Sequence, residues 1–503
     1  MIDLFLLHDK NEDFFPESWL GFEGNNLNEL IKELLQEILK NKHKSKYWLC
    51  QEISRNINMC NNGIWNYLNN KKYVLLPIIS ELLNIWKNEC NKTDDDLNSF
   101  KKKILSSIQE IKVNNSSSIK LKAIKELDEQ LSFILGSHAA DGMISVHLTF
   151  SSNNIKLLYE IKQKLETLLN EKIENKFYFD NYKKMHNFGI SLNNTTNKKI
   201  SEFLISYSYI LNRDIRFKRE YRWKLVDGYE GAVSILKKHI YEIFGINLTI
   251  KRDESKAWKI EIKNKVLIRY LHKIFDFPYG YKSRIVDEPN LIKESNLKNR
   301  TAFLRGFFTF DGGINRDKSI KLTTYSEPIF ESLKNILNVN HIKFTSCKVN
   351  RGGFQIQNSK NLKEWLIVFE RNTEKWKKLN AIINGNHTFV DNKSSFMEIL
   401  SQIYPKLPKC RFSIGELIES SKELNVYDIN ELSIYLIKKY NIKITNLTLM
   451  RNIEILERCN VLKRIKTKEI FIRNTGNMSG TNGAFSKNVF TYNPNIKEWR
   501  LPY

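Results

Sequence analysis

Several features are missing from this sequence, and each absence excludes a class of protein. No run of about 18 apolar residues occurs, which excludes an ordinary membrane-spanning helix. The first residues, MIDLFLLHDKNEDF, carry acids and no basic segment, so we expect no signal peptide and a cytoplasmic protein. The 6 cysteines form no CxxC pair and lie far from zinc-finger spacing, which predicts reduced thiols without zinc. The residues that protein splicing needs at both ends are also missing, so we expect a free-standing or intron-encoded protein.

Acidic residues are scarce relative to basic ones. Asp and Glu number 56 against 80 Lys and Arg, which gives a net charge of +24 over 503 residues. Such a basic protein usually binds a polyanion, and nucleic acid is a better candidate than an anionic membrane surface. The 41% of hydrophobic residues supports real cores, and the length suggests about three or four domains.

Both ends of the chain have the apolar spacing of helices. Within 1–115, helices near 51–57 and 63–68 have helix-turn-helix proportions, although a plain helical hairpin explains them equally well. Within 395–475, three amphipathic helices and an alternating strand pair fit a winged helix or a helical bundle. The Gly- and Asn-rich segment 476–503 predicts a mobile tail.

The middle of the chain repeats one pattern and contains two similar motifs. Three copies of a strand, an amphipathic helix and further strands occur over about 125–385. The motifs are FILGSHAADGMI and FLRGFFTFDGGI. Their alignment places Gly136 against Gly306 and Asp141 against Asp311, with the same offset for both pairs. Each motif reads as an apolar helix that has a small residue in its middle and ends in Asp-Gly.

The motif composition predicts close helix packing and a cation. Gly136 and Ala140 lie on one side of a helix, where small residues let another backbone approach. A carboxylate in the last turn faces the negative end of the helix dipole, at a cost of about 0.3–1 kcal/mol. The glycines after Asp141 and Asp311 suit a left-handed position. Two such carboxylates side by side would require a cation between them. Carboxylate oxygens are hard ligands, and Mg²⁺ is the cation that such ligands naturally bind.

These segments resemble the two LAGLIDADG motifs of the monomeric homing endonucleases. FDFPYGYKSRIVDEPNLI, before the second motif, is similar to that region in archaeal-type members. The resemblance implies an α+β fold of two pseudo-symmetric αββαββα halves, at 125–290 and 298–388. Their antiparallel sheets would form a saddle on DNA, flanked by the helix-turn-helix or winged-helix-like domains. A monomer would cut both strands of a specific double-stranded DNA site and leave short 3′ overhangs.

The resemblance also assigns residues. Asp141, Asp311 and Lys282 would be catalytic, and Gly142 and Gly312 would join the two aspartates in binding Mg²⁺ or Mn²⁺. Gly136, Ala140 and Gly306 would pack the motif helices. We expect the following residues to contact DNA: Lys224, Lys251, Arg252, Lys256, Lys259, Lys321, Arg351, Gln355 and Gln357.

Three departures from the family pattern create further expectations. His138 replaces an apolar residue, and we expect it to point at a polar neighbour. Phe310 stands where Ala is common, which predicts an asymmetric helix contact. The third αβ unit is either an insertion at 143–215 or a sign that 216–285 is an extra module. RFKREYRWKLVDG favours the insertion, which would place Lys224 and Asp227 near DNA.

Two other functions fit the same fold. An RNA maturase would bind a host intron RNA with its basic sheets. A transcription regulator would bind DNA without cutting it. Neither of these functions needs both Asp141 and Asp311, so their joint presence favours the endonuclease.

Overall fold

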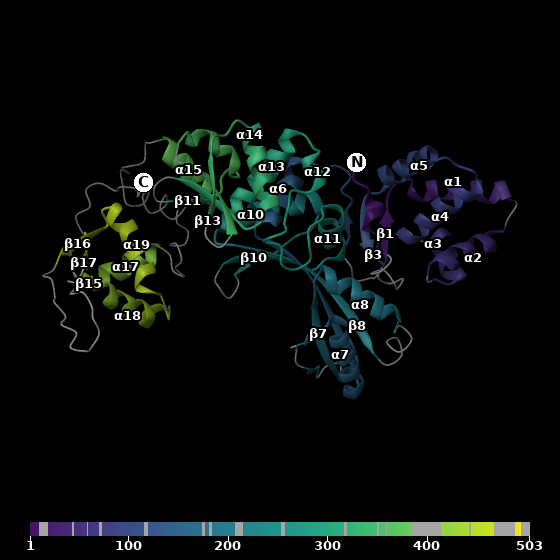
Figure 1. The fold of residues 1–503 in the computed structure, drawn as a ribbon, viewed down its shortest axis with the longest axis horizontal. Helices are drawn as coiled ribbons and strands as arrows, with labels where there is room; N and C mark the ends of the chain where they lie inside the picture. Colours follow the sequence, from purple (N-terminus) through teal and green to yellow (C-terminus); the bar gives the residue numbers. More distant parts are fainter. Residues whose placement is uncertain are drawn as a thin grey trace.

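The computed structural model describes all residues except 10–18, 43–44, 58, 70–72, 115–118, 174–176, 181–183, 207–214, 253–256, 316–318, 350–351, 359, 385–413, 442–443, 467–487 and 494–503. The described part is mixed α/β with several antiparallel sheets, which agrees with the predicted α+β class (Figure 1). One hydrophobic core extends from Ile2 to Leu379, and a second extends from Leu417 to Phe490. Among the described helices, none has the length and apolar character needed to cross a membrane.

The N-terminal region combines helices with a small sheet. Its helices are α1 (Leu27–Lys42), α2 (Lys46–Asn56), α3 (Asn61–Asn69), α4 (Leu76–Glu89) and α5 (Asp94–Ser107). Four short strands form an antiparallel sheet of order β2-β1-β3-β4: β1 (Leu20–Glu23), β2 (Val74–Leu75), β3 (Glu110–Val113) and β4 (Leu121–Lys122). The sequence predicted helices alone here, because strands of two to four residues leave too short an alternation to detect.

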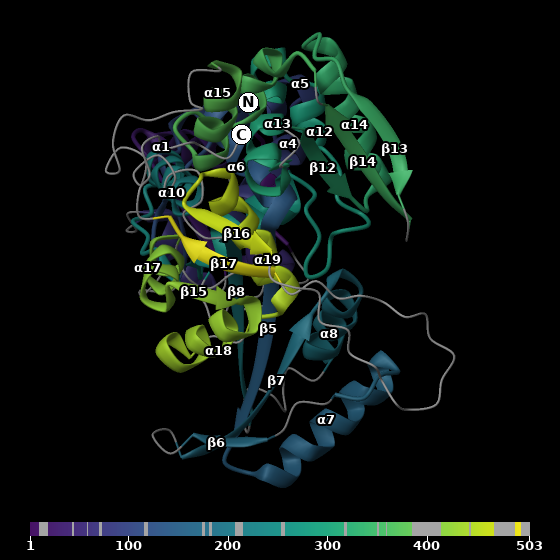
Figure 2. The same cartoon turned by 90° about the vertical axis from the view of Figure 1, so that its left-hand side faces the viewer.

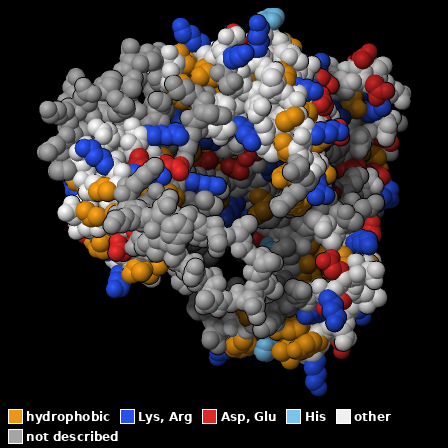
Figure 3. Space-filling view, turned by 60° about the vertical axis from the view of Figure 1, so that its left-hand side comes forward, with side chains coloured by type: hydrophobic (Ala, Val, Ile, Leu, Met, Phe, Trp, Pro, Cys, Tyr) orange, Lys and Arg blue, Asp and Glu red, His pale blue; other side chains and the backbone are white. Residues whose placement is uncertain are grey.

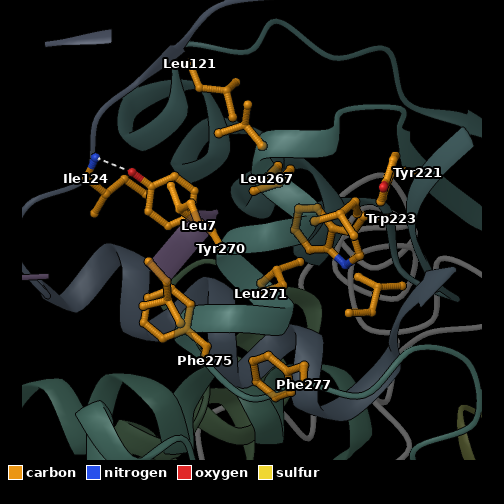
Figure 4. Close-up of a cluster of buried hydrophobic side chains, with 14 of the residues drawn as sticks. Leu7, Leu121, Ile124, Tyr221, Trp223, Leu267, Tyr270, Leu271, Phe275 and Phe277 are labelled. Carbon is orange, nitrogen blue, oxygen red and sulfur yellow. Dashed lines mark hydrogen bonds between the residues drawn. The ribbon is translucent and has the colours of Figure 1, made fainter. Parts of the chain in front are cut away.

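The N-terminal residues pack against the middle of the chain. The short helix η1 (Leu4–Leu7) lies on η3 (Tyr270–Ile274), a single π-helical turn that follows α11 (Lys265–Arg269). The buried Arg269 guanidinium donates to the Leu7 carbonyl at 3.0 Å. The Ile124 amide donates to the Tyr270 hydroxyl at 3.0 Å, inside the aromatic cluster that Figure 4 shows. These contacts make 1–9 part of the central core.

The second motif begins a simple αββαββα unit. Its elements are α13 (Leu297–Asp311), β11 (Gly313–Ile314), β12 (Ile320–Thr324), α14 (Glu327–Val339), β13 (Thr345–Val349), β14 (Gly353–Asn358) and the 3-10 helix η5 (Leu362–Val368). The strands form an antiparallel sheet of order β11-β12-β14-β13. The helix α15 (Glu374–Asn384) follows and contacts both η5 and β11.

The first motif begins a longer unit with the same strand order. Its shared elements are α6 (Glu129–Asp141), β5 (Gly142–Ser152), β8 (Arg216–Asp227), α10 (Glu230–Phe244), β9 (Lys251–Arg252) and β10 (Trp258–Ile262). Between β5 and β8 the described residues form four further elements: α7 (Ile155–Leu169), β6 (Tyr178–Asp180), β7 (Met185–Leu192) and α8 (Asn194–Ser206). The sheet order is β6-β7-β5-β8-β10-β9, so β5-β8-β10-β9 repeats the order of the second sheet.

The repeated order favours an insertion between the two strands of a hairpin over an extra module at 216–285. The inserted residues are 153–215 and not the predicted 143–215, because β5 belongs to the shared sheet order. We call the described part of 153–215, together with the flanking strands β5 and β8 that it joins, the inserted lobe. In Figures 1 and 2, its elements α7, β7 and α8 project away from the motif helices α6 and α13.

The C-terminal region has its own core. It contains α17 (Ile414–Leu424), α18 (Ile429–Tyr440), α19 (Asn446–Arg458) and three antiparallel strands of order β15-β17-β16: β15 (Val426–Asp428), β16 (Leu462–Lys466) and β17 (Asn488–Tyr492). The central strand β17 lies inside 476–503, where we predicted a mobile tail, and its Phe490 is fully buried. A lone strand in a Gly- and Asn-rich segment has no periodic partner that would reveal it from sequence.

Candidate functional site

Two glycines bring the motif helices α6 and α13 into backbone contact. A Cβ atom on Gly136 would lie 2.0 Å from the Phe303 carbonyl oxygen, and one on Gly306 would lie 2.2 Å from that of Phe133. Both distances are far below van der Waals contact, so no other residue fits without a shift of the helices. Phe133 and Phe303 are themselves counterparts in the two motifs, and the contact is therefore reciprocal. The asymmetry expected from Phe310 is not seen at the glycines.

The helices end in a pair of neighbouring aspartates, each of which affects the pKa of the other. Asp141 closes α6 and Asp311 closes α13, and both side chains reach solvent. Loss of surrounding water and repulsion by Asp141 raise the pKa of Asp311 to about 7. Loss of water also raises the pKa of Asp141, against the effect of Lys375 and Lys282. Two neighbouring carboxyls resist carrying two negative charges at once.

A lysine lies at the end of each motif helix. The Lys282 ammonium donates to the carbonyls of Ala139 and Ala140 at 2.5 Å each. The Lys375 ammonium donates to the carbonyl of Phe310 at 2.6 Å, and Phe310 is the counterpart of Ala140. A cation is favourable at the negative end of a helix dipole. Burial lowers the pKa of Lys282 to about 8, while Asp311 and Asp141 oppose this shift.

The sequence pointed to Lys282 as a candidate but gave no sign of Lys375. Lys282 lies far beyond Asp141 in the sequence, whereas Lys375 follows Asp311 much more closely. The inserted lobe accounts for most of this difference, so a search at the fixed motif offset does not reach Lys375. Aligning the two halves after residues 153–215 are removed would have revealed Lys375 as a candidate.

A third carboxylate distinguishes the two halves. Asp227 ends β8, is buried, and accepts a hydrogen bond from the Tyr229 amide at 2.5 Å. Burial raises its pKa to about 6; nearby Lys375 opposes the rise, and Asp141 adds to it. The equivalent residue at the end of β12 is Thr324, which accepts from the Ser326 amide at 3.3 Å. The two sides of the aspartate pair therefore differ chemically.

The donor set fits a hard divalent cation. Among the described residues, no three His, Cys, Asp or Glu side chains gather closely enough to hold a metal alone. Mg²⁺ commonly takes one or two carboxylates and completes its shell with water and substrate phosphates. Asp141 and Asp311 match this pattern, since a cation between them would offset the repulsion by Asp141 that adds to the raised pKa of Asp311.

The glycines after the aspartates differ from the expectation. Gly142 and Gly312 have φ of −74° and −65°, which is extended backbone and not left-handed. The need for glycine is instead spatial: a Cβ atom would lie 2.2 Å from the His138 ring and 2.5 Å from the Phe308 carbonyl oxygen. Their amides donate to the His138 and Phe308 carbonyls and end the helices. Ala140 is half-buried beside them.

His138 does not point at a polar neighbour as predicted. Its ring is fully buried and contacts the rings of Phe277, at 4.4 Å between centroids, and Trp223, at 6.0 Å. Neither ring nitrogen has a hydrogen-bond partner among the described residues. Burial, helped by the positive charge of Lys282, holds the pKa of His138 well below its usual value. The neutral imidazole therefore acts as an aromatic packing residue.

The predicted DNA-contacting residues are divided between the two sheets. Lys224 pairs with Met143 and Glu261, and Lys321 occupies the same place in the second sheet, opposite Gly313 and Gln357. Each lysine thus lies opposite the second residue after a motif aspartate. Lys251 pairs with Lys259 across β9 and β10.

Some of these side chains already have partners. The Arg252 guanidinium lies 4.4 Å from the Trp258 ring, and Lys259 pairs with Glu261 at 3.0 Å. The Gln355 amide donates to Gln357 at 2.6 Å. Lys256 and Arg351 lie outside the described residues. In Figure 3, Lys and Arg side chains lie around a small group of acidic side chains near the centre of the face.

Comparisons with known proteins give only weak matches. No protein-family model matches the chain. A segment is 27% identical over 119 residues to the "Probable translation initiation factor IF-2" of Thermococcus kodakarensis, and covers 22% of this chain. That match spans only 10% of the initiation factor.

The structural matches include LAGLIDADG homing endonucleases. A variant of I-DmoI, solved with its target DNA and Mn, has a TM-score of 0.27 and 11% identity, and covers 48% of this chain and 93% of its own. I-WcaI bound to its DNA recognition sequence has a TM-score of 0.22 and 15% identity, over 30% and 70%. Full-length DUF199/WhiA has a TM-score of 0.22 and 13% identity, over 47% and 84%. Scores this low do not establish a shared fold.

Proposed function

We propose that this chain is a metal-dependent, site-specific endonuclease that cuts both strands of DNA and leaves short 3′ overhangs. The observation that carries the proposal is the Asp141–Asp311 pair, which two reciprocal glycines bring together at the ends of two crossing helices. A fold gains nothing from two adjacent carboxylates with raised pKa values, and perturbed carboxylates of this kind mark functional sites.

The pair would act through a divalent cation. Mg²⁺ or Mn²⁺ held by Asp141 and Asp311 would supply Lewis-acid stabilisation of the charge that develops on the phosphate. The chain's own residues would do the rest. Lys282 and Lys375, one on each helix end, would attract the two scissile phosphates. Asp227, with a pKa of about 6, would accept a proton from the attacking water near neutral pH.

The bond changes are those of phosphodiester hydrolysis. A water oxygen attacks phosphorus, the bond from phosphorus to the 3′ oxygen breaks, and that oxygen takes up a proton. Each strand then ends in a 3′-hydroxyl and a 5′-phosphate. Because Thr324 replaces Asp227 on the second side, the two strands would be cut at different rates.

The two sheets would hold the DNA as a saddle on both sides of the pair. The lysines and glutamines on their polar faces suit phosphates and base edges. The flanking regions 1–115 and 395–475 would add helix-turn-helix and winged-helix contacts. The exposed side chains Asn62, Asn66 and Asn69 lie on one side of α3, as a base-reading helix requires.

The test compares the wild-type chain with the Asp141→Asn/Asp311→Asn variant on a randomised library of DNA sites in Mg²⁺, with sequencing of the cut ends. Discrete cuts by the wild type alone would support the endonuclease. Specific binding without cleavage would instead indicate a regulator. Tight binding of a structured intron RNA, with neither cleavage nor specific DNA binding, would indicate a maturase.

A further inference from the structure

The inserted lobe has one covered face and one open face. Its helices α7 and α8 pack on the side of β5 and β7 that carries Leu148, Phe150 and Phe188, all fully buried. Strand side chains alternate between faces, so the neighbours of these residues point to the other side. On that side His147 and Thr149 are half-buried, and Ser191 is exposed. We call it the open face.

The strand β8 lines the open face with basic residues. Arg216, Lys218, Arg222 and Lys224 alternate with inward residues and lie opposite Ser151, Thr149, Ser145 and Met143 of β5. A step of two residues is about 6.6 Å in a strand, close to the rise of two base pairs, about 6.8 Å. The row begins beside Gly142 at the aspartate pair and ends nine residues later. It therefore spans about 30 Å, the length of roughly nine base pairs.

One acid organises these cations. The Glu220 carboxylate accepts hydrogen bonds from Arg222 at 2.7 Å and Lys218 at 3.1 Å, and lies 3.6 Å from Lys263. Three cations around one carboxylate leave a surplus of positive charge on this face. Arg216 is exposed and has no ion pair among the described residues. The open face is therefore a preformed anion-binding surface.

The outer edge of the lobe adds neutral contact groups. The row that ends at Arg216 continues across the sheet through Ser151 to the buried Asn187, whose amide bonds Ser151 and the Met185 carbonyl, and then to Tyr178, which is 55% exposed. Four residues further in along the two strands, the Ser191 hydroxyl bonds the His147 ring at 2.9 Å. Hydroxyl and phenol groups beside guanidinium groups are those that contact the sugar-phosphate backbone.

We propose that the open face of the inserted lobe binds the duplex that flanks the cut site, so that the bound DNA is longer on the first-half side. The proposal rests on the proposed nuclease function, because the row of cations is continuous with the aspartate pair. The two halves also differ: in the described part of the second half no elements are inserted between β11 and β12, and β12 spans only Ile320–Thr324. Duplex DNA fits better than RNA, since a straight row of cations matches the regular spacing of a duplex backbone.

The test uses the full chain and the double variant Arg216→Ala/Lys218→Ala. The matched control, Lys156→Ala/Lys199→Ala, removes two exposed lysines from α7 and α8 on the covered side of the same lobe. Hydroxyl-radical footprinting measures the length of bound DNA. The probe is uncut DNA that carries the recognised site, and EDTA prevents cleavage. We expect the wild-type footprint to extend further from the cut on one side, and the variant to lose that extension. The control should keep it.

Salt titrations give a second measurement. Loss of two phosphate contacts should lower the slope of log K against log salt by about 1.8, and affinity should fall about tenfold or more near physiological salt. The charge-preserving variant Arg216→Lys/Lys218→Arg should keep the wild-type salt slope and affinity. This result would show that the loss in the alanine variant comes from lost charge and not from misfolding. A footprint symmetric about the cut, or an unchanged slope, would overturn the proposal while wild-type cleavage still stood.

These measurements distinguish failure of the nuclease proposal from failure of the proposal that the lobe binds DNA. If the wild type cuts no site, the same slope measured on random-sequence duplex still decides whether the lobe binds DNA. A variant that loses affinity for structured RNA but not for duplex would also overturn the proposal.

Discussion

Gly136 and Gly306 hold equivalent positions on α6 and α13, and each faces the other helix's backbone where a Cβ atom would stand. The distances from those positions to the opposing carbonyl oxygens are 2.0 and 2.2 Å. The spacing of Asp141 and Asp311 follows from this contact, because both are five residues beyond a glycine. Helix packing and site geometry are therefore set by the same two residues.

The first prediction concerns Gly136→Ala. Alanine normally stabilises a helix interior by about 0.5–1 kcal/mol relative to glycine. Here the added methyl meets a backbone carbonyl, so we expect the free energy of unfolding to fall by about 1–3 kcal/mol. Urea denaturation followed by circular dichroism measures the change. Gly228→Ala is the control, since a Cβ atom there would meet nothing within 4 Å. Equal stabilities for the two variants would contradict the close contact.

The second prediction concerns pH and metal. The folded pKa of Asp311, about 7, lies above its ordinary value of 3.8. The folded state therefore binds more protons than the unfolded state between these values, and in EDTA stability should fall as pH rises from about 4 to about 7. Asp311→Asn should remove this fall and exceed the wild type in Tm above pH 7. Added Mg²⁺ should restore the lost stability of the wild type but should not stabilise Asp311→Asn.

Thermal melts from pH 5 to 8.5, with EDTA or Mg²⁺, check both parts. Asp95→Asn, an exposed position on α5, is the control and should behave like the wild type. A Mg²⁺ response that survives in Asp311→Asn would show that the cation binds elsewhere.

The sequence made part of this site predictable. Periodicity and the two Asp-Gly ends predicted the motif helices and the likeness between Asp141 and Asp311, and the family resemblance implied the α+β class. The surroundings of side chains were not predictable from sequence. We expected His138 to point at a polar neighbour, yet the fold encloses it in aromatic rings. Lys375 was missed because the inserted lobe breaks the constant spacing. β2 and β17 were missed because a strand's pairing partner, and not its own pattern, places it in a sheet.

The third prediction compares the lysines at the helix ends. Lys282→Met or Lys375→Met removes a cation that lowers the pKa of both aspartates, so their pKa values should rise further. Metal binding and cleavage should then weaken by about 100-fold at pH 7, and the pH profile of cleavage should move to higher pH. Single-turnover cleavage across pH measures this shift.

Lys378→Met is the matched control for the lysines. Lys378 lies one turn from Lys375 on α15 and donates to the Ile314 carbonyl at 2.9 Å. Its loss removes a similar hydrogen bond but no charge that acts on the aspartates, so the pH profile should not move. Profiles that move equally in all three variants would reduce the roles of Lys282 and Lys375 to structural ones.

The last prediction concerns His138 and acid stability. Its folded pKa lies well below the ordinary value of 6.5, so the unfolded state binds a proton that the folded state excludes. Stability from the neutral ring is complete above pH 6.5 and is lost as pH falls below it. His138→Phe keeps the ring contacts with Phe277 and Trp223 but cannot be protonated. Its free energy of unfolding should therefore change less between pH 7 and pH 5 than that of the wild type.

Urea denaturation at both pH values measures the difference, and His341→Asn, at an exposed position, should leave the wild-type pH dependence intact. An unchanged dependence in His138→Phe would mean that the buried ring finds a proton partner after all.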